Sequence, residues 1–297
     1  MPRYLDPKGD VVFKKIFSQH PHLLKSFLNA VLPLPENGLI DSLEYLHPEQ
    51  IPEIPALKRP IIDVKCKDSN GRIFIVEMQI EWTDAFKQRL LFNSSKAYVK
   101  QLQKGEEYHL LNPVYGLGIL ASVFDRDSDD WYHHYRIVNV GKPERVIEGL
   151  QLVFIELPKF KPVNISQKKL QVLWLRFMKE INEKTQTIEP ELLKVPEIRE
   201  AISLTEEAGY TPQELEAYDK YWDAVSTEKT LWTGRFDEGI EKGRQEGREE
   251  GREEGREEGS RSEKISLAKK LLAEDFSLEK ISQLTGLSSE ELKDLVS

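Results

Sequence analysis

Apolar side chains near the start of the chain recur at intervals of three and four residues, the spacing of one helix face. This pattern predicts a helix over residues 10–32. Pro21 lies inside it, and proline removes a backbone donor, so we expect two helical pieces or a kink near His20. The apolar positions that define the face are Val12, Phe13, Ile16, Phe17, Leu23, Leu24, Phe27, Leu28 and Val31.

Two stretches with apolar residues at alternate positions, 61–67 and 73–81, predict β-strands. The residues between them, 68–72, contain the pair Asn70-Gly71, which favours a tight reversal of the chain. The two strands should therefore form an antiparallel hairpin. Residues 41–47 predict a further short strand ahead of the hairpin.

The elements that follow complete a mixed α/β pattern. Residues 84–104 predict a helix that ends near Gly105, and three later apolar stretches predict strands at 114–124, 131–140 and 152–157. A helix, a hairpin, a helix and further strands are typical of a mixed sheet covered by helices. We therefore place an α/β domain at residues 1–160.

The second half of the chain predicts helices and one repeat. Residues 166–235 form a helical region, and residues 263–297 resemble a small helix-turn-helix, with Ser288 and Glu291 spaced as a capping box. Between them, 236–262 carries a glycine, arginine and glutamate repeat of period four, which lacks the apolar positions of a heptad coiled coil. The repeat fits a flexible linker, a weakly helical stalk or a glycine-packed stalk that joins copies into a homo-oligomer.

Charge and cysteine content narrow the functions that the chain can have. The net charge of −9 argues against a broad basic face for nucleic acid, so contact with DNA needs a local patch or a metal ion. Cys66 is the one cysteine, which excludes an intramolecular disulfide and a multi-cysteine zinc site. The N-terminal residues show no signal peptide, and no apolar run has membrane-spanning length, so we expect a cytoplasmic protein without membrane contact.

The hairpin carries the most informative chemistry. Because side chains alternate between the faces of a strand, Glu77 and Gln79 share a face. A five-residue loop at 68–72 would place Asp63 directly opposite Glu77, and a three-residue loop at 68–70 would make Glu77 a diagonal neighbour of Asp63. Two facing carboxylates repel each other, and a divalent cation between them removes that cost. The alternative is a solvated hairpin of mixed charge, and spacing alone leaves both open.

These residues resemble a known superfamily. Pro60 and Asp63, followed fourteen residues after Asp63 by Glu77 and Gln79, resemble the PD-(D/E)xK nucleases. The runs DPKGDVVFKKIF, RPIIDVKC, FIVEMQIEW and FKQRLLFNSSKAYVKQLQKGEEY are more narrowly similar to bacterial recombination-promoting nucleases with transposase-like sequences. The resemblance covers roughly residues 5–160. It implies a restriction-endonuclease-like α/β core, a mixed sheet flanked by helices.

The resemblance also implies roles for individual residues. Asp63 and Glu77 would bind Mg²⁺, with Mn²⁺ as an alternative, and Asp10 matches an additional acidic metal ligand that some superfamily members carry on their first helix. An acid in a first helical turn is equally an ordinary polar residue. Gln79 occupies the position where the superfamily usually has lysine.

Glutamine at position 79 can orient a water molecule but supplies no positive charge. Lys14 on the first helix and Lys65 on the Asp63 face are candidates for the missing cation. Arg89 and Lys96, on the helix after the hairpin, either reach a phosphate or lie on a solvated helix face.

The sequence therefore predicts a metal-dependent DNA endonuclease that promotes recombination or acts on mobile DNA. The alternative is a catalytically weak, nuclease-like binding or assembly module, which the glutamine and the acidic balance favour. The C-terminal module offers acids (Glu290, Glu291 and Asp294) where a DNA-reading helix normally has arginine, asparagine or glutamine, so a protein-interaction role fits it at least as well.

Overall fold

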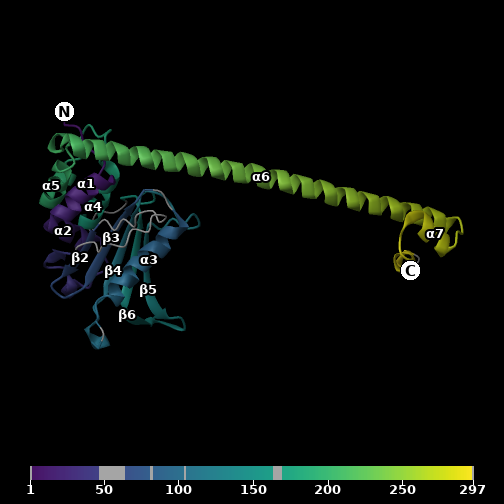
Figure 1. The fold of residues 1–297 in the computed structure, drawn as a ribbon, viewed down its shortest axis with the longest axis horizontal. Helices are drawn as coiled ribbons and strands as arrows, with labels where there is room; N and C mark the ends of the chain where they lie inside the picture. The colour runs from purple at the N-terminus through teal and green to yellow at the C-terminus, as the bar shows by residue number, and fades with distance from the viewer. Residues whose placement is uncertain (1, 47–63, 81–82, 104, 163–168, 296–297) are drawn as a thin grey trace. The chain divides into compact units, whose positions relative to one another are not determined.

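The computed structural model describes residues 2–46, 64–80, 83–103, 105–162 and 169–295. The chain forms two compact units, Met1–Thr227 and Glu228–Ser297. The first contains the sheet and the helices that cover it, and Figure 1 shows its layers.

A six-stranded mixed sheet, in the order β1-β2-β3-β4-β6-β5, is the centre of the first unit. Strands β3, β4 and β6 run parallel to one another, whereas the β1–β2, β2–β3 and β5–β6 pairs are antiparallel. The strands are β1 (Leu43–Tyr45), β2 (Val64–Asp68), β3 (Ile73–Gln79), β4 (Val114–Leu120), β5 (Tyr132–Asn139) and β6 (Lys142–Glu156).

The β2–β3 hairpin has the expected turn and register. Lys67 lies opposite Ile73 and Val64 opposite Val76, the pairing that a five-residue loop predicts. Gly71 has a φ of 80°, which a side chain would disfavour, and the Asp68 carboxylate accepts from the backbone N–H of Asn70 and of Arg72. The first residues of the predicted strand, 61–63, lie outside the described residues.

One face of the sheet shares an apolar core with a layer of helices (Figure 1). The predicted break at His20 is confirmed, because one helix ends at Gln19 and the next begins with Pro21 at its first turn. Val64, Cys66, Phe74 and Val76 of the hairpin point into this core. The helices are α1 (Asp10–Gln19), α2 (Pro21–Val31), α4 (Lys169–Glu180) and α5 (Pro196–Ser203).

Helix α3 (Asp84–Val99) covers the opposite face and packs on a second apolar cluster with Ile73 and Ile75. It lies close over β4, which has glycine where the helix passes. A Cβ at Gly116 would lie 2.5 Å from the Ser94 hydroxyl, and one at Gly118 would lie 2.9 Å from the Phe86 ring. The Gly-x-Gly pattern of β4 therefore sets how closely α3 approaches the sheet.

Three predicted boundaries are wrong. Strand β6 begins at Lys142, ten residues before the predicted start at 152. The first half of this strand is exposed, so it has no apolar pattern, and its backbone pairing with β5 is what makes it a strand. Strand β4 ends at Leu120 rather than 124. Helix α3 ends at Val99 rather than 104, and the chain then turns towards Gly105, whose φ is 95°.

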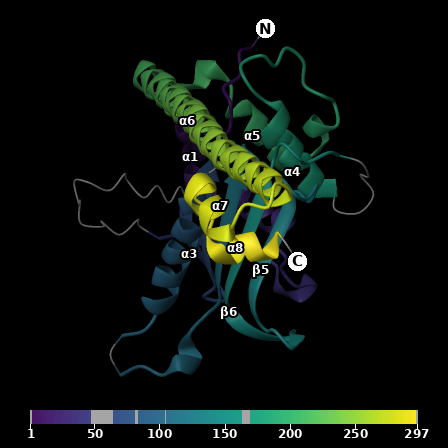
Figure 2. The same cartoon turned by 90° about the vertical axis from the view of Figure 1, so that its right-hand side faces the viewer.

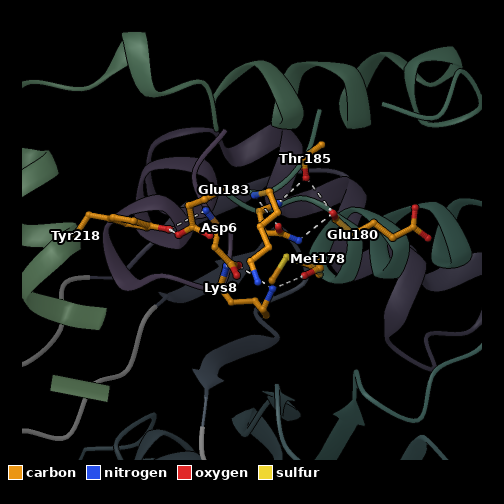
Figure 3. Close-up of polar contacts among 9 residues, drawn as sticks. Asp6, Lys8, Met178, Glu180, Glu183, Thr185 and Tyr218 are labelled. Atoms are coloured by element: carbon orange, nitrogen blue, oxygen red, sulfur yellow. Dashed lines mark hydrogen bonds and ion pairs between the residues drawn. The ribbon is translucent and has the colours of Figure 1, made fainter. Parts of the chain in front are cut away.

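A buried polar cluster joins the N-terminal segment to the helical layer (Figure 3). The Lys8 ammonium lies 2.7 Å from the Asp6 carboxylate and donates to the Met178 carbonyl oxygen. The Tyr218 hydroxyl accepts from the Asp6 backbone N–H and donates to the Glu183 carboxylate. Burial raises the pKa of Asp6, and Lys8 partly offsets this. The cluster fixes the chain immediately before α1.

The second unit contains a small three-helix module. The end of α6 (Pro212–Ala273) packs against α7 (Leu278–Thr285) and α8 (Ser289–Asp294), and Figure 2 shows these helices together. Ser288 and Glu291 form the predicted capping box, and Gly286 ends α7 with a φ of 73°. The repeat lies within α6, and a Cβ added at any of its glycines would have no other atom within 4 Å.

None of the helices in the part of the chain that the structure describes combines the length and apolar character that crossing a bilayer requires.

Candidate active site

The end of strand β3 presents two polar side chains towards α3. Glu77 and Gln79 alternate with Val76 and Met78, which belong to the core on the other face. Glu77 is fully buried and Gln79 is partly exposed. The predicted change along this strand, from an apolar face to a polar one, is confirmed.

Two residues of α3 hold the Glu77 carboxylate. Asn93 Nδ2 donates to Oε1 at 2.9 Å, and Arg89 Nε donates to Oε2 at 3.2 Å. The same guanidinium donates from Nη2 to Gln79 Oε1 at 2.7 Å. Because Arg89 and Asn93 are four residues apart, they lie on one flank of α3, above β3. Arg89 thus links the two polar residues of β3.

The electrostatics at Glu77 reflect its burial. Burial raises the pKa of the Glu77 carboxyl group, while the hydrogen bond from Asn93 and the charge of Arg89 lower it. A buried carboxylate is costly unless a cation and hydrogen bonds compensate for lost water. The cation that compensates Glu77 is Arg89, and one-third of the Arg89 side chain remains exposed to solvent.

Asp63, the predicted central ligand, lies outside the described residues. The observed register pairs Val64 with Val76, and the next pair in the same register is 63 with 77. The facing of Asp63 and Glu77 therefore stays a prediction.

The other predicted site residues lie in two places. Lys65 is opposite Ile75, so it shares the α3 face with Glu77 and is partly buried. Asp10 and Lys14 lie on α1, in the helical layer, and form an ion pair at 2.7 Å. Among the contacts of the described residues, none joins Asp10 or Lys14 to Glu77 or Gln79.

The donor set at Glu77 and Gln79 suits a hard cation. A carboxylate and an amide oxygen are both ligands that Mg²⁺ accepts, completed by water and phosphate oxygens. The described residues contain no group of three or more histidine, cysteine, aspartate or glutamate side chains that could hold a metal ion. A metal at this site therefore requires a second carboxylate, and position 63 is the position that the register offers.

Sequence reasoning misses Asn93, and for Arg89 it allows both a phosphate contact and a solvated helix face. The available signal was their four-residue spacing along α3, beside the apolar stripe of Phe86 and Leu90. That spacing indicates a polar flank but does not show which strand the flank covers.

A second buried carboxylate lies on the same face and at the same end of the sheet. Glu156 of β6 pairs with Leu120 of β4, which in turn pairs with Gln79 of β3, so the three side chains lie side by side across the sheet. Its oxygens accept from His133 Nε2 at 2.8 Å, from Lys159 Nζ at 3.1 Å and from the Phe124 backbone N–H at 3.0 Å. Glu156 thereby joins β5, β6 and the segment after β4.

The comparison with protein families gives one match. The family model described as "PD-(D/E)XK nuclease family transposase" matches residues 7–230 of the 297. The chain belongs to this family, which confirms the resemblance found in the sequence and is consistent with the restriction-endonuclease-like α/β fold. Searches among curated proteins and among solved structures gave no match.

Proposed function

We propose that this chain is a divalent-metal-dependent DNA endonuclease of the cytoplasm. The observation that carries the proposal is the position of Glu77, a fully buried carboxylate at the end of β3 with Gln79 beside it. Family membership supports the nuclease chemistry and a nucleic-acid substrate. We further propose that the cleavage promotes recombination or acts on mobile DNA.

In this proposal Asp63 and Glu77 hold Mg²⁺, and Mn²⁺ can replace it. A divalent metal held there would supply polarisation of the phosphodiester and activation of a water nucleophile. Asn93 fixes the Glu77 carboxylate through Oε1, so that its direction does not depend on the ion. The Gln79 amide orients the attacking water, and Asp10 remains a proposed supporting ligand.

Arg89 is the cation that best replaces the missing lysine. It contacts both Glu77 and Gln79, and its partly exposed side chain can turn towards a phosphate. Lys14 is already paired with Asp10, and Lys65 lies two residue pairs from Glu77, towards the turn of the hairpin. The charge that stabilises the transition state therefore comes from Arg89, with Lys14 and Lys65 as secondary candidates.

Plasmid cleavage by the purified full chain tests the proposal. Nicking or linearisation should occur with Mg²⁺ or Mn²⁺, should stop with chelator and should be absent in Asp63→Ala. Asp219→Ala, an exposed acid on α6, is the matched control and should cleave like the parent protein. Equal cleavage by Asp63→Ala would reject the site.

One observation favours a second function, that of a catalytically weak binding or assembly module. The Arg89 guanidinium already neutralises Glu77 in the described structure, so a metal ion has to compete with it. The absence of a lysine at position 79 points the same way. Metal binding by calorimetry without cleavage under any metal would select this function over the nuclease.

A further inference from the structure

Two lysines lie beside the Glu77 site, one on the hairpin and one on the helix that covers it. Lys65 lies on β2 opposite Ile75, two residues along β3 from Glu77 and on the same face. Lys96 lies on α3, about one turn after Asn93, on the flank that covers β3. Both side chains are partly buried, and their ammonium groups are close enough for the two positive charges to repel each other.

Within the described part of the chain, neither ammonium group has a hydrogen-bond or ion-pair partner. Other lysines of this unit differ: Lys14 pairs with Asp10, Lys67 with Glu44 and Lys159 with Glu156. Two like charges placed near each other are unfavourable in the free protein when no acid is paired with either of them, and the one described carboxylate nearby, Glu77, is paired with Arg89. The two ammonium groups are therefore available to an anion from outside the protein.

The surroundings agree with this interpretation. Both side chains are partly buried, and charge-assisted hydrogen bonds to a phosphate would compensate for the water that they have lost. The remaining neighbours on this flank are Arg89 and Asn93, which also donate hydrogen bonds, so the flank is a line of donors from Arg89 to Lys96.

We propose that Lys65 and Lys96 together bind a non-scissile phosphate of the DNA backbone, next to the phosphate at Glu77. Two residues along a strand correspond to about 7 Å. Since DNA rises about 3.4 Å per nucleotide of one strand, this separation is short enough for Lys65 and Glu77 to lie near phosphates of the same strand. The inference rests on the proposed nuclease function for its substrate, but it concerns binding and not cleavage.

Fluorescence anisotropy with a labelled DNA duplex of about 20 base pairs tests the site, because each phosphate contact contributes about one to the salt slope. The assay uses the full chain in chelator, so that neither cleavage nor a bridging metal contributes. The variants are Lys65→Gln, Lys96→Gln and the double variant. The matched control is Lys194→Gln, an exposed lysine beside α5 in the helical layer.

Each single variant should bind about tenfold more weakly at low salt, the effect of losing one charge-assisted contact. The slope of log affinity against log salt should fall by about one in the double variant, which loses the one phosphate contact, and the control should match the parent protein. The melting temperature should not fall, because each substitution removes repulsion. A structural lysine would instead lower the melting temperature and leave the salt slope unchanged.

Unchanged affinity and salt slope in the double variant would overturn the proposal, as would a parent protein that does not bind the duplex. The two proposals also fail separately. Lysine-dependent binding by a protein that never cleaves keeps the phosphate site and rejects the nuclease. Metal-dependent cleavage, combined with unaltered binding by the double variant, keeps the nuclease and rejects the phosphate site.

Discussion

Glu77 and Glu156 are both fully buried carboxylates on the α3 face of the sheet, and both lie near the ends of parallel strands. Their cations differ. Lys159, which pairs with Glu156, also donates to the carbonyl oxygens of Asp125 and Asp130 and is almost completely covered. Arg89, which pairs with Glu77, donates only to side chains of β3 among the contacts described, and one-third of it is exposed.

The difference separates a structural role from a functional one. Glu156, His133 and Lys159 close the segment between β4 and β5, and each of them is satisfied within the protein. The Arg89 side chain already reaches water, so it can turn from Glu77 towards a phosphate and stay hydrated. Lys159 is covered and also donates to two carbonyl oxygens, so leaving Glu156 would break these bonds and separate a buried ion pair. Equal burial therefore does not mean equal function.

The largest effect should follow the change Glu77→Gln. Losing a metal ligand should lower plasmid cleavage by at least about a hundredfold, the size reported for losing one electrostatic stabiliser. The fold should remain, because the amide keeps the shape of the side chain and Arg89 reaches water. Cleavage rate and circular dichroism together check this. A Glu77→Gln protein that cleaves normally would contradict the difference between the two carboxylates.

The change Glu156→Gln should have the opposite profile. It leaves Lys159 buried without its anion, so the free energy of unfolding should fall by about 3 kcal/mol. Cleavage by the folded fraction should match that of the parent protein. Urea unfolding measures the first quantity and a plasmid assay at low temperature the second. A loss of cleavage in fully folded protein would place Glu156 in the active site instead.

The change Arg89→Gln should lower cleavage by about tenfold, a smaller effect than that of Glu77→Gln because the glutamine still donates a hydrogen bond. Arg199→Gln, an exposed arginine on α5, is the control and should change nothing. Single-turnover cleavage at saturating DNA gives the chemical rate. If Arg89→Gln lowers the melting temperature but not this rate, Arg89 has only the structural role that Lys159 has.

The smallest effect concerns His134 on β5. It follows His133, the residue that contacts Glu156, and its side chain points to the opposite face of the sheet. It contacts Gln151 rather than an acid, and burial lowers its pKa. The folded state favours neutral His134 more than the unfolded state does. The free energy of unfolding should therefore decrease as the pH falls below about 6.5, the usual pKa of histidine, because protonation then favours the unfolded chain. His134→Gln should therefore reduce the loss of melting temperature between pH 7.5 and 5.5. An unchanged pH dependence would exclude this contribution.

Local patterns were sufficient for much of the fold. The apolar spacing of residues 10–32 and Pro21 predicted the break between α1 and α2, and Asn70-Gly71 predicted the hairpin. Both depend on contacts between near neighbours. The first half of β6 was missed because its side chains are exposed, and only its pairing with β5 defines it as a strand.

The candidate site divides in the same way. The alternation of residues 73–79 placed Glu77 and Gln79 on one face, whereas the structure decided the register of the hairpin, which the sequence leaves open between a five-residue and a three-residue loop. The partners of Glu77 come from α3, and the sequence does not show which flank of a helix meets which strand. The packing in the structure decides this: the Gly-x-Gly segment of β4 lets α3 approach the sheet closely, and Arg89 and Asn93 then lie above β3.

The sequence by itself thus determined most of the elements, the pairing of two strands as a hairpin and the family, since each is encoded in the type and spacing of nearby residues. Only the tertiary structure decided which cation serves which carboxylate. It gave Arg89 to Glu77, Lys159 to Glu156 and Lys14 to Asp10, and left Lys65 beside Lys96. The physical reason is that charge pairing depends on distance and burial, which packing sets between residues far apart in the chain.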